Sequence, residues 1–201
     1  MRVGLHNPLN LSAIERFSEP FNYFVSPQAL GIDSSAKLLS WLETEAPWSL
    51  VETDFYEQYE FSFWDVDVPS ALLVLREPDF LSALKTKVER LFKVELRNEI
   101  DIAAHKLVPG QRIRIHNDLV GDEKTYRLLI QLNRGCRDED GGLLILFNSS
   151  DPADIHRVFR PIHNSAIGFA VSPISNHAVS TVHGGERFTL VYSLYGKNGN
   201  G

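Results

Sequence analysis

The stretch Ile113-Arg114-Ile115-His116-Asn117-Asp118 ends a segment in which apolar residues recur at every second position. The alternation begins near Glu99, and its members are Ile100, Ile102, Ala104, Ile113 and Ile115. A period of two is typical of a β-strand with one buried face. Side chains at positions i and i+2 of a strand point to the same side, so the H-x-D spacing predicts His116 and Asp118 on one face.

Further short alternating segments follow, separated by turns that contain Gly, Asn and Asp, at 126–132, 143–147, 165–171, 177–182 and 187–195. Many short strands at turn-separated intervals favour a sandwich or barrel. We therefore expect a mainly β protein with flanking helices (α+β). The strand count suits a double-stranded β-helix of the jelly-roll or cupin type.

The first half of the chain predicts two helices. Ser34-Ser35 could cap a helix that runs to about Glu45, and Pro78 can open a second one because proline fits the first helical turn. The second helix would bury the residues that recur at helical spacing, which are Phe80, Leu84, Val88 and Leu91. We expect three regions: a helical and stranded support region at 1–98 packed on the core, the β core at 99–195 and a flexible tail at 196–201.

Two histidines and one carboxylate can fill one face of a metal's coordination sphere and leave the other positions open. This arrangement suits non-haem Fe(II), which must bind a cosubstrate and O2 together. His177 is the candidate for the second histidine, and Arg187 follows ten residues later. Arg187 and Thr189 share one face of a predicted strand, and a guanidinium is the natural partner of a carboxylate. His183, two residues before Gly185, is the rival for the distal histidine ligand.

The order of these motifs resembles the Fe(II)- and 2-oxoglutarate-dependent oxygenases, most closely the prolyl-hydroxylase-like branch. The order is H-x-D, then an apolar strand ending at Gln131-Leu132-Asn133, then Gly141-Gly142, then H-x-V-x-x-V-x-x-G-x-R from His177 to Arg187. Residues from about 100 to 195 carry the resemblance. H-x-D alone is a weak motif, whereas the ordered set is specific.

The resemblance implies that Fe(II) is bound by His116, Asp118 and His177, with 2-oxoglutarate and O2 as cosubstrates. Arg187, together with Thr189, would hold the distal carboxylate of 2-oxoglutarate.

Other pocket residues depart from the pattern of the family or match it less closely. Gln131 stands where many relatives place a tyrosine that also contacts this carboxylate. His105 stands five residues before Gly110, where some relatives place a polar cosubstrate contact. Leu143 replaces the acidic residue that usually follows the glycine pair. Arg127 shares strand parity with Gln131, so it either points into the pocket toward a substrate or is exposed.

The resemblance implies hydroxylation of an amino-acid residue in a peptide or protein substrate. The alternative is a hydroxylase of a free amino acid or small metabolite in a biosynthetic pathway. A third hypothesis is a non-catalytic jelly-roll module that binds a metal.

Composition limits the partners. The 201 residues carry a net charge of -6 and a sequence pI of about 5.6, which argues against nucleic-acid and anionic-membrane partners. Cys136 is the single cysteine, so no intramolecular disulfide framework is possible. The first residues lack an apolar signal core, and we expect a cytoplasmic protein.

Overall fold

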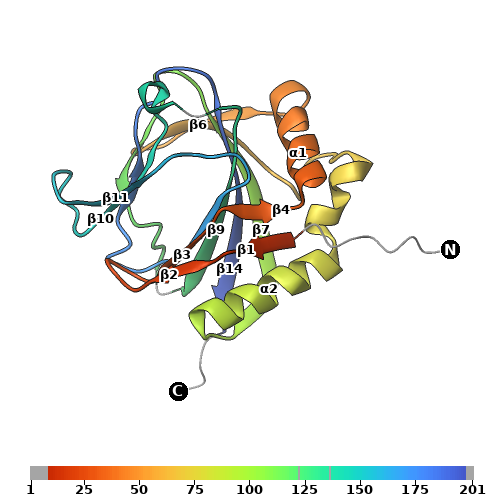
Figure 1. The fold of residues 1–201 in the computed structure, drawn as a ribbon, viewed down its shortest axis with the longest axis horizontal. Coiled ribbons are helices and arrows are strands. Elements are labelled where there is room, and N and C mark those ends of the chain that lie inside the picture. The colour runs from red at the N-terminus through yellow and green to blue at the C-terminus, as the bar shows by residue number, and fades with distance from the viewer. Residues whose placement is uncertain (1–8, 122, 136, 198–201) are drawn as a thin grey trace.

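The computed structural model describes residues 9–121, 123–135 and 137–197, and Cys136 lies outside them. Two β-sheets face each other, and the helices lie on the outer side of the larger one (Figure 1). The larger sheet has eight strands in the spatial order β2 (Glu15–Phe17), β3 (Tyr23–Ser26), β12 (Ala166–Ala170), β9 (Thr125–Leu132), β14 (Arg187–Gly196), β7 (Leu96–Leu107), β6 (Glu57–Ser62) and β5 (Ser49–Glu52). The smaller sheet has four, in the order β11 (Ile155–Phe159), β10 (Leu144–Phe147), β13 (His177–Val179) and β8 (Ile113–His116).

A separate pair is formed by β1 (Leu9–Ser12) and β4 (Gln28–Leu30), and all strand pairs of the described residues are antiparallel. The predicted class, mainly β with flanking helices, is confirmed.

Two helices and a 3-10 segment cover the larger sheet: α1 (Ile32–Thr44), η1 (Ser70–Arg76) and α2 (Pro78–Phe92). The second helix begins at Pro78 as predicted, and Phe80, Leu84 and Val88 are buried on it. The predicted cap of the first helix is wrong, because α1 begins after Gly31 and has no side-chain cap. Ser35 lies in its first turn, and its hydroxyl donates instead to the carbonyl of Ile32 over 2.9 Å. None of the helices in the described ranges is long and apolar enough to cross a membrane.

The central strand β14 is buried on both faces, and its apolar residues alternate with mostly polar ones. Phe188, Leu190, Tyr192 and Leu194 belong to the core between the sheet and the helices. The alternate residues, Arg187, Thr189, Val191 and Ser193, line a cavity between the two sheets. The predicted shared face of Arg187 and Thr189 is therefore present, and the strand carries both a core and a site.

The expected regions are connected through the larger sheet. Strands β2, β3, β5 and β6 come from the first 98 residues, yet they are hydrogen-bonded into the same sheet as β7, β9, β12 and β14. The expected tail starts too early, since Gly196 is the last residue of β14 and the Lys197 N–H donates to the Glu95 carbonyl over 2.9 Å. Residues 198–201 lie outside the described residues.

Candidate metal centre

His116 and His177 are direct cross-strand partners. His116 ends β8 and His177 begins β13, and the antiparallel register places them opposite each other. Their ring centroids are 4.2 Å apart. Opposite residues of an antiparallel pair lie on the same face, so the pairing aims both imidazoles into the space between the sheets.

The backbone fixes which nitrogen of each ring is available. His116 Nδ1 lies 2.9 Å from the Arg114 carbonyl oxygen, and His177 Nδ1 lies 2.8 Å from that of Ser175. A carbonyl oxygen only accepts, so each Nδ1 carries the hydrogen and donates it. The lone pair of each ring is therefore on Nε2, the atom that faces the Asp118 carboxylate. Such a backbone partner orients a histidine for metal binding.

Asp118 joins the histidines by a route that the sequence did not predict. Strand β8 ends at His116, so strand alternation does not place Asp118, and the expectation that both residues sit on the strand is wrong. Asp118 has a positive φ of 61°, an uncommon conformation for a non-glycine residue. The turn returns the carboxylate to the histidines, with Oδ1 3.2 Å from His116 Nε2 and Oδ2 3.7 Å from His177 Nε2.

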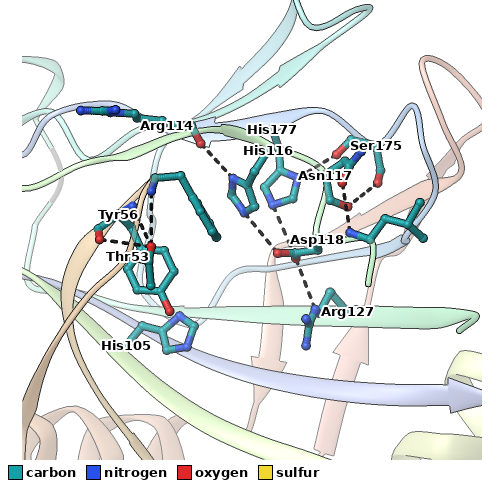
Figure 2. A network of polar contacts seen from close by, with 12 residues as sticks. Thr53, Tyr56, His105, Arg114, His116, Asn117, Asp118, Arg127, Ser175 and His177 are labelled. Atoms are coloured by element: carbon teal, nitrogen blue, oxygen red, sulfur yellow. Dashed lines mark hydrogen bonds and ion pairs between the residues drawn. The ribbon is translucent and has the colours of Figure 1, made fainter. Parts of the chain in front are cut away.

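Asn117, the middle residue of the motif, anchors this turn. Its side-chain oxygen accepts the Leu119 N–H over 3.1 Å, and its side-chain nitrogen donates to the Pro173 carbonyl over 3.3 Å. The buried Ser175 hydroxyl donates to the Asn117 carbonyl over 2.9 Å. These contacts connect the turn to the loop before His177, as Figure 2 shows. Sequence reasoning missed both positioning residues, although asparagine's preference for turns was a signal for Asn117.

The donor set fits a divalent transition metal. Among the described residues, His116, Asp118 and His177 form the one group whose ligand atoms could hold a metal, and these atoms all lie within 4.8 Å of one another. Two imidazoles and one carboxylate are the ligands of the facial arrangement that non-haem Fe(II) oxygenases use. His183, the rival candidate, is not part of the group. The backbone N–H of His183 donates to the Asp140 carbonyl in the turn before Arg187.

The triad opens into a cavity of about 480 Å³ between the sheets. The lining includes most of the pocket residues expected from the sequence, namely His105, Arg127, Arg187 and Thr189. Gln131 does not line it. This buried side chain lies beside Thr189, its cross-strand partner, whose hydroxyl donates to Gln131 Oε1 over 3.2 Å. An amide at this position therefore orients Thr189.

Arg127 points into the cavity, which settles its direction. Its Nε donates to Asp118 Oδ2 over 3.3 Å, and its terminal nitrogen donates to the Ser193 hydroxyl. In Figure 2 this guanidinium and the two imidazoles converge on the same carboxylate.

The charges around the triad keep it ready to bind a cation. Burial favours the neutral form of Asp118, but the neighbouring His116, His177 and Arg127 outweigh it and hold the carboxyl pKa below its ordinary value. Burial also lowers the pKa of His177 to about 4. At neutral pH the site therefore presents an anionic carboxylate and a neutral imidazole at His177, both in the form that metal binding requires.

The glycine pair Gly141-Gly142 lies close to the Thr181 carbonyl and to the Arg187 side chain. Gly141 has a φ of +69°, and a Cβ there would lie 1.9 Å from the Thr181 carbonyl oxygen. A Cβ on Gly142 would lie 3.0 Å from Arg187 Cδ. Both positions therefore require glycine, which explains the pair that the sequence showed before Leu143.

A family model agrees with this geometry. The model of the 2OG-Fe(II) oxygenase superfamily matches residues 102–195. The chain is similar to this superfamily over that stretch, which is just under half of its length. Fe(II) is the metal of these oxygenases, and 2-oxoglutarate and O2 are their cosubstrates. The match covers both histidines, the carboxylate and Arg187.

Solved structures of oxygenases show the same fold. A prolyl-4-hydroxylase of Pseudomonas putida superposes with a TM-score of 0.69 at 16% identity, covering 88% of this chain and 93% of that one. A prolyl hydroxylase of Trichoplax adhaerens, solved with a peptide fragment of hypoxia inducible factor, gives a TM-score of 0.65 at 13% identity, covering 87% of this chain and 83% of that one. The predicted double-stranded β-helix is confirmed.

A curated relative of this chain is the prolyl 3-hydroxylase sudestada1 of Drosophila melanogaster. The two are 25% identical over 178 residues, which cover 83% of this chain and 32% of the relative. The chain thus spans about a third of the length of that protein.

Proposed function

We propose that this chain is an Fe(II)- and 2-oxoglutarate-dependent dioxygenase that hydroxylates an amino-acid residue in a peptide or protein. The observation that supports it best is the meeting of the His116, Asp118 and His177 ligand atoms within 4.8 Å at a cavity that also holds a buried Arg187. A metal site and a carboxylate-binding cation in one cavity are what this chemistry requires.

Fe(II) would be held by His116 Nε2, His177 Nε2 and the Asp118 carboxylate. When bound, it supplies the O2-activating chemistry that couples decarboxylation of 2-oxoglutarate to hydroxylation of a C–H bond. The protein's own contribution is placement. The Nδ1 hydrogen bonds to the backbone hold both imidazole rings, and Arg127 holds the carboxylate.

The cosubstrate would lie along the face of β14 that lines the cavity. Arg187 would pair with the distal carboxylate, and Thr189, oriented by Gln131, would contact the same oxygens. His105 occupies the position opposite Thr189 on β7, so it would lie beside the cosubstrate. Arg187 and Thr189 are both buried, which limits their contact with bulk water.

Exposed apolar side chains at the entrance of the cavity favour a large substrate. Leu119 and Val120 follow the triad directly and are 36% and 80% exposed, and both line the cavity. Exposed apolar side chains at an entrance suit contact with a peptide. The names of the relatives agree, since one was solved with a peptide fragment and others are prolyl hydroxylases. A prolyl residue is one option for the modified group. A cytoplasmic location, suggested by the lone cysteine, is part of the proposal.

The test begins without oxygen. Fe(II) and then 2-oxoglutarate are added to metal-free protein, and the visible spectrum is recorded beside His177→Ala, whose folding is checked by circular dichroism. We expect a metal-to-ligand charge-transfer band in the wild type alone. Its absence from folded wild-type protein would favour a non-catalytic metal-binding module.

The substrate class needs a second experiment. The loaded enzyme is exposed to O2 with a peptide library or with free amino acids, and products are analysed by mass spectrometry. Gain of one oxygen atom on a peptide supports the proposal, whereas gain only on a free amino acid supports the small-metabolite alternative.

A further inference from the structure

The cavity contains a second carboxylate, on β6. Glu60 lies opposite His105 of β7, and His105 lies opposite Thr189 of β14, so the three side chains form one row across adjacent strands. All three line the cavity. Glu60 therefore faces the same space as the proposed metal and cosubstrate sites, although neither site uses it.

Glu60 is held by neutral neighbours. Gln58 Nε2 donates to Glu60 Oε2 over 2.7 Å, and His105 Nε2 lies 4.0 Å from the same oxygen. Burial, followed by the charge of Arg127, lowers the pKa of His105 to about 4, so this imidazole carries no positive charge at neutral pH. Across the described ranges, no lysine or arginine lies within ion-pair distance of Glu60.

The other carboxylate of the cavity is different. Asp118 faces two imidazoles and the Arg127 guanidinium, and it would also receive the metal. Glu60 keeps only 28% of its side-chain exposure and receives no such compensation. A partly buried carboxylate without a cation is unfavourable, and a cationic ligand removes this cost.

Gln58 adds a second unused acceptor. Its side chain is 2% exposed and lines the cavity, and its Oε1 has no hydrogen-bond partner among the described residues. Its amide nitrogen is already committed to Glu60. An unsatisfied acceptor beside an uncompensated carboxylate fits a ligand group that donates several hydrogen bonds and carries positive charge.

We propose that Glu60 and Gln58 bind a cationic group of the substrate, an ammonium or a guanidinium. This inference rests on the proposed function and narrows its substrate class. The group is the side chain of a basic residue in a peptide or the amine of a small molecule, and Glu60 is a specificity-determining residue. A purely structural carboxylate would instead be satisfied by the Gln58 amide and the Tyr56 hydroxyl, and it would show no preference between ligands.

The test measures charge preference by calorimetry on protein loaded anaerobically with Fe(II) and 2-oxoglutarate. One probe pair is a short capped peptide with lysine at its centre and the same peptide with norleucine there. The other pair is n-butylammonium and 1-butanol. We expect at least one cation to bind about tenfold or more tightly than its neutral counterpart, which corresponds to about 1.4 kcal/mol. The pair that shows the preference identifies the source of the cation.

Glu60→Gln keeps the shape of the side chain and removes its charge. The ratio of the cation's affinity to that of its neutral counterpart should therefore fall toward one. Glu52→Gln is the matched control, because Glu52 is an exposed carboxylate on the neighbouring strand β5 and does not line the cavity. Equal binding within both pairs, no binding of either cation, or a preference that survives in Glu60→Gln would each overturn the proposal.

The proposed function has its own readout in the charge-transfer band. A wild type that shows no band but a Glu60-dependent preference for a cation would refute the oxygenase activity and keep the cation site. A band without the preference would support the oxygenase activity and refute the cation site.

Discussion

The Arg127 guanidinium lies against the Asp118 carboxylate, with 3.3 Å between Arg127 Nε and Asp118 Oδ2. It also donates to the hydroxyl of Ser193, so it is itself held in place. The one anionic ligand of the triad is thus oriented by a residue from the opposite sheet.

This contact predicts a loss of metal affinity when it is removed. Partners of metal ligands typically account for about 10–100-fold in affinity, so Arg127→Ala should weaken Fe(II) binding within that range. Arg127→Lys keeps the charge but not the planar geometry, so it should lose less Fe(II) affinity than Arg127→Ala. Anaerobic Fe(II) titration measures both, with Arg90→Ala, an exposed arginine of α2, as the control. Unchanged affinity in Arg127→Ala would refute the orienting role.

Arg187 should act on the cosubstrate and not on the metal. Removing a charge-assisted pair costs on the order of 1.5–3 kcal/mol, so Arg187→Ala should weaken 2-oxoglutarate binding by about 10–100-fold while Fe(II) affinity stays within about twofold. Titrating each ligand separately into the variant separates the two effects. If both affinities fell equally, the assigned role of Arg187 would be wrong.

Metal loading should stabilise the folded chain. A ligand that binds only the folded state adds about 2.7 kcal/mol at a free concentration of 100 times its Kd. For a chain of this length that gain raises Tm by roughly 5–10 °C. Mn(II), which resists oxidation, is a suitable probe in a thermal melt, and a chelator should reverse the shift. His177→Ala should show no gain, and an equal gain there would place the bound metal elsewhere.

The metal-free protein should lose stability as the pH falls from about 6.5 to 4. Burial lowers the pKa of both His105 and His177 to about 4, so in this range the unfolded chain binds protons that the folded chain does not. Stability then rises with pH across the range, by on the order of 1–3 kcal/mol for each histidine. His105 keeps 26% of its side-chain exposure, so we expect it to contribute the smaller share of this change in stability.

Urea unfolding at a series of pH values measures this dependence. His105→Gln should flatten the curve, whereas His156→Gln, an exposed histidine of β11, should leave it unchanged. A curve of equal slope in wild type and His105→Gln would contradict the cause that we assign.

The identity and order of the triad were predictable from the sequence, but its geometry was not. The H-x-D motif and the distal histidine gave the residues. The direct pairing of His116 with His177 depends on the register of two strands far apart in the chain, and local patterns carry no information about it. The left-handed turn at Asp118 depends on contacts that Asn117 makes with a loop near Pro173.

Strand parity also explains what was missed in the cavity. The pairing of β6 with β7 depends on a register that the local sequence does not specify, so nothing indicated that Gln58 and Glu60 share a face with His105. Strand β11 was missed altogether, because its exposed Ile155 and Val158 do not follow a buried alternation. In contrast, β14 was recognised from its continuous alternation, and the face of Arg187 followed directly.

The proposed metal and cosubstrate contacts are divided between the two sheets. His116 and His177 belong to the four-stranded sheet, whereas Arg187 and Thr189 belong to β14 of the eight-stranded sheet. A cosubstrate that chelates the metal and pairs with Arg187 would tie the two layers together through a single molecule. Loading should therefore slow amide hydrogen exchange in β10 and β13, and the four-stranded layer would become more rigid before any substrate arrives.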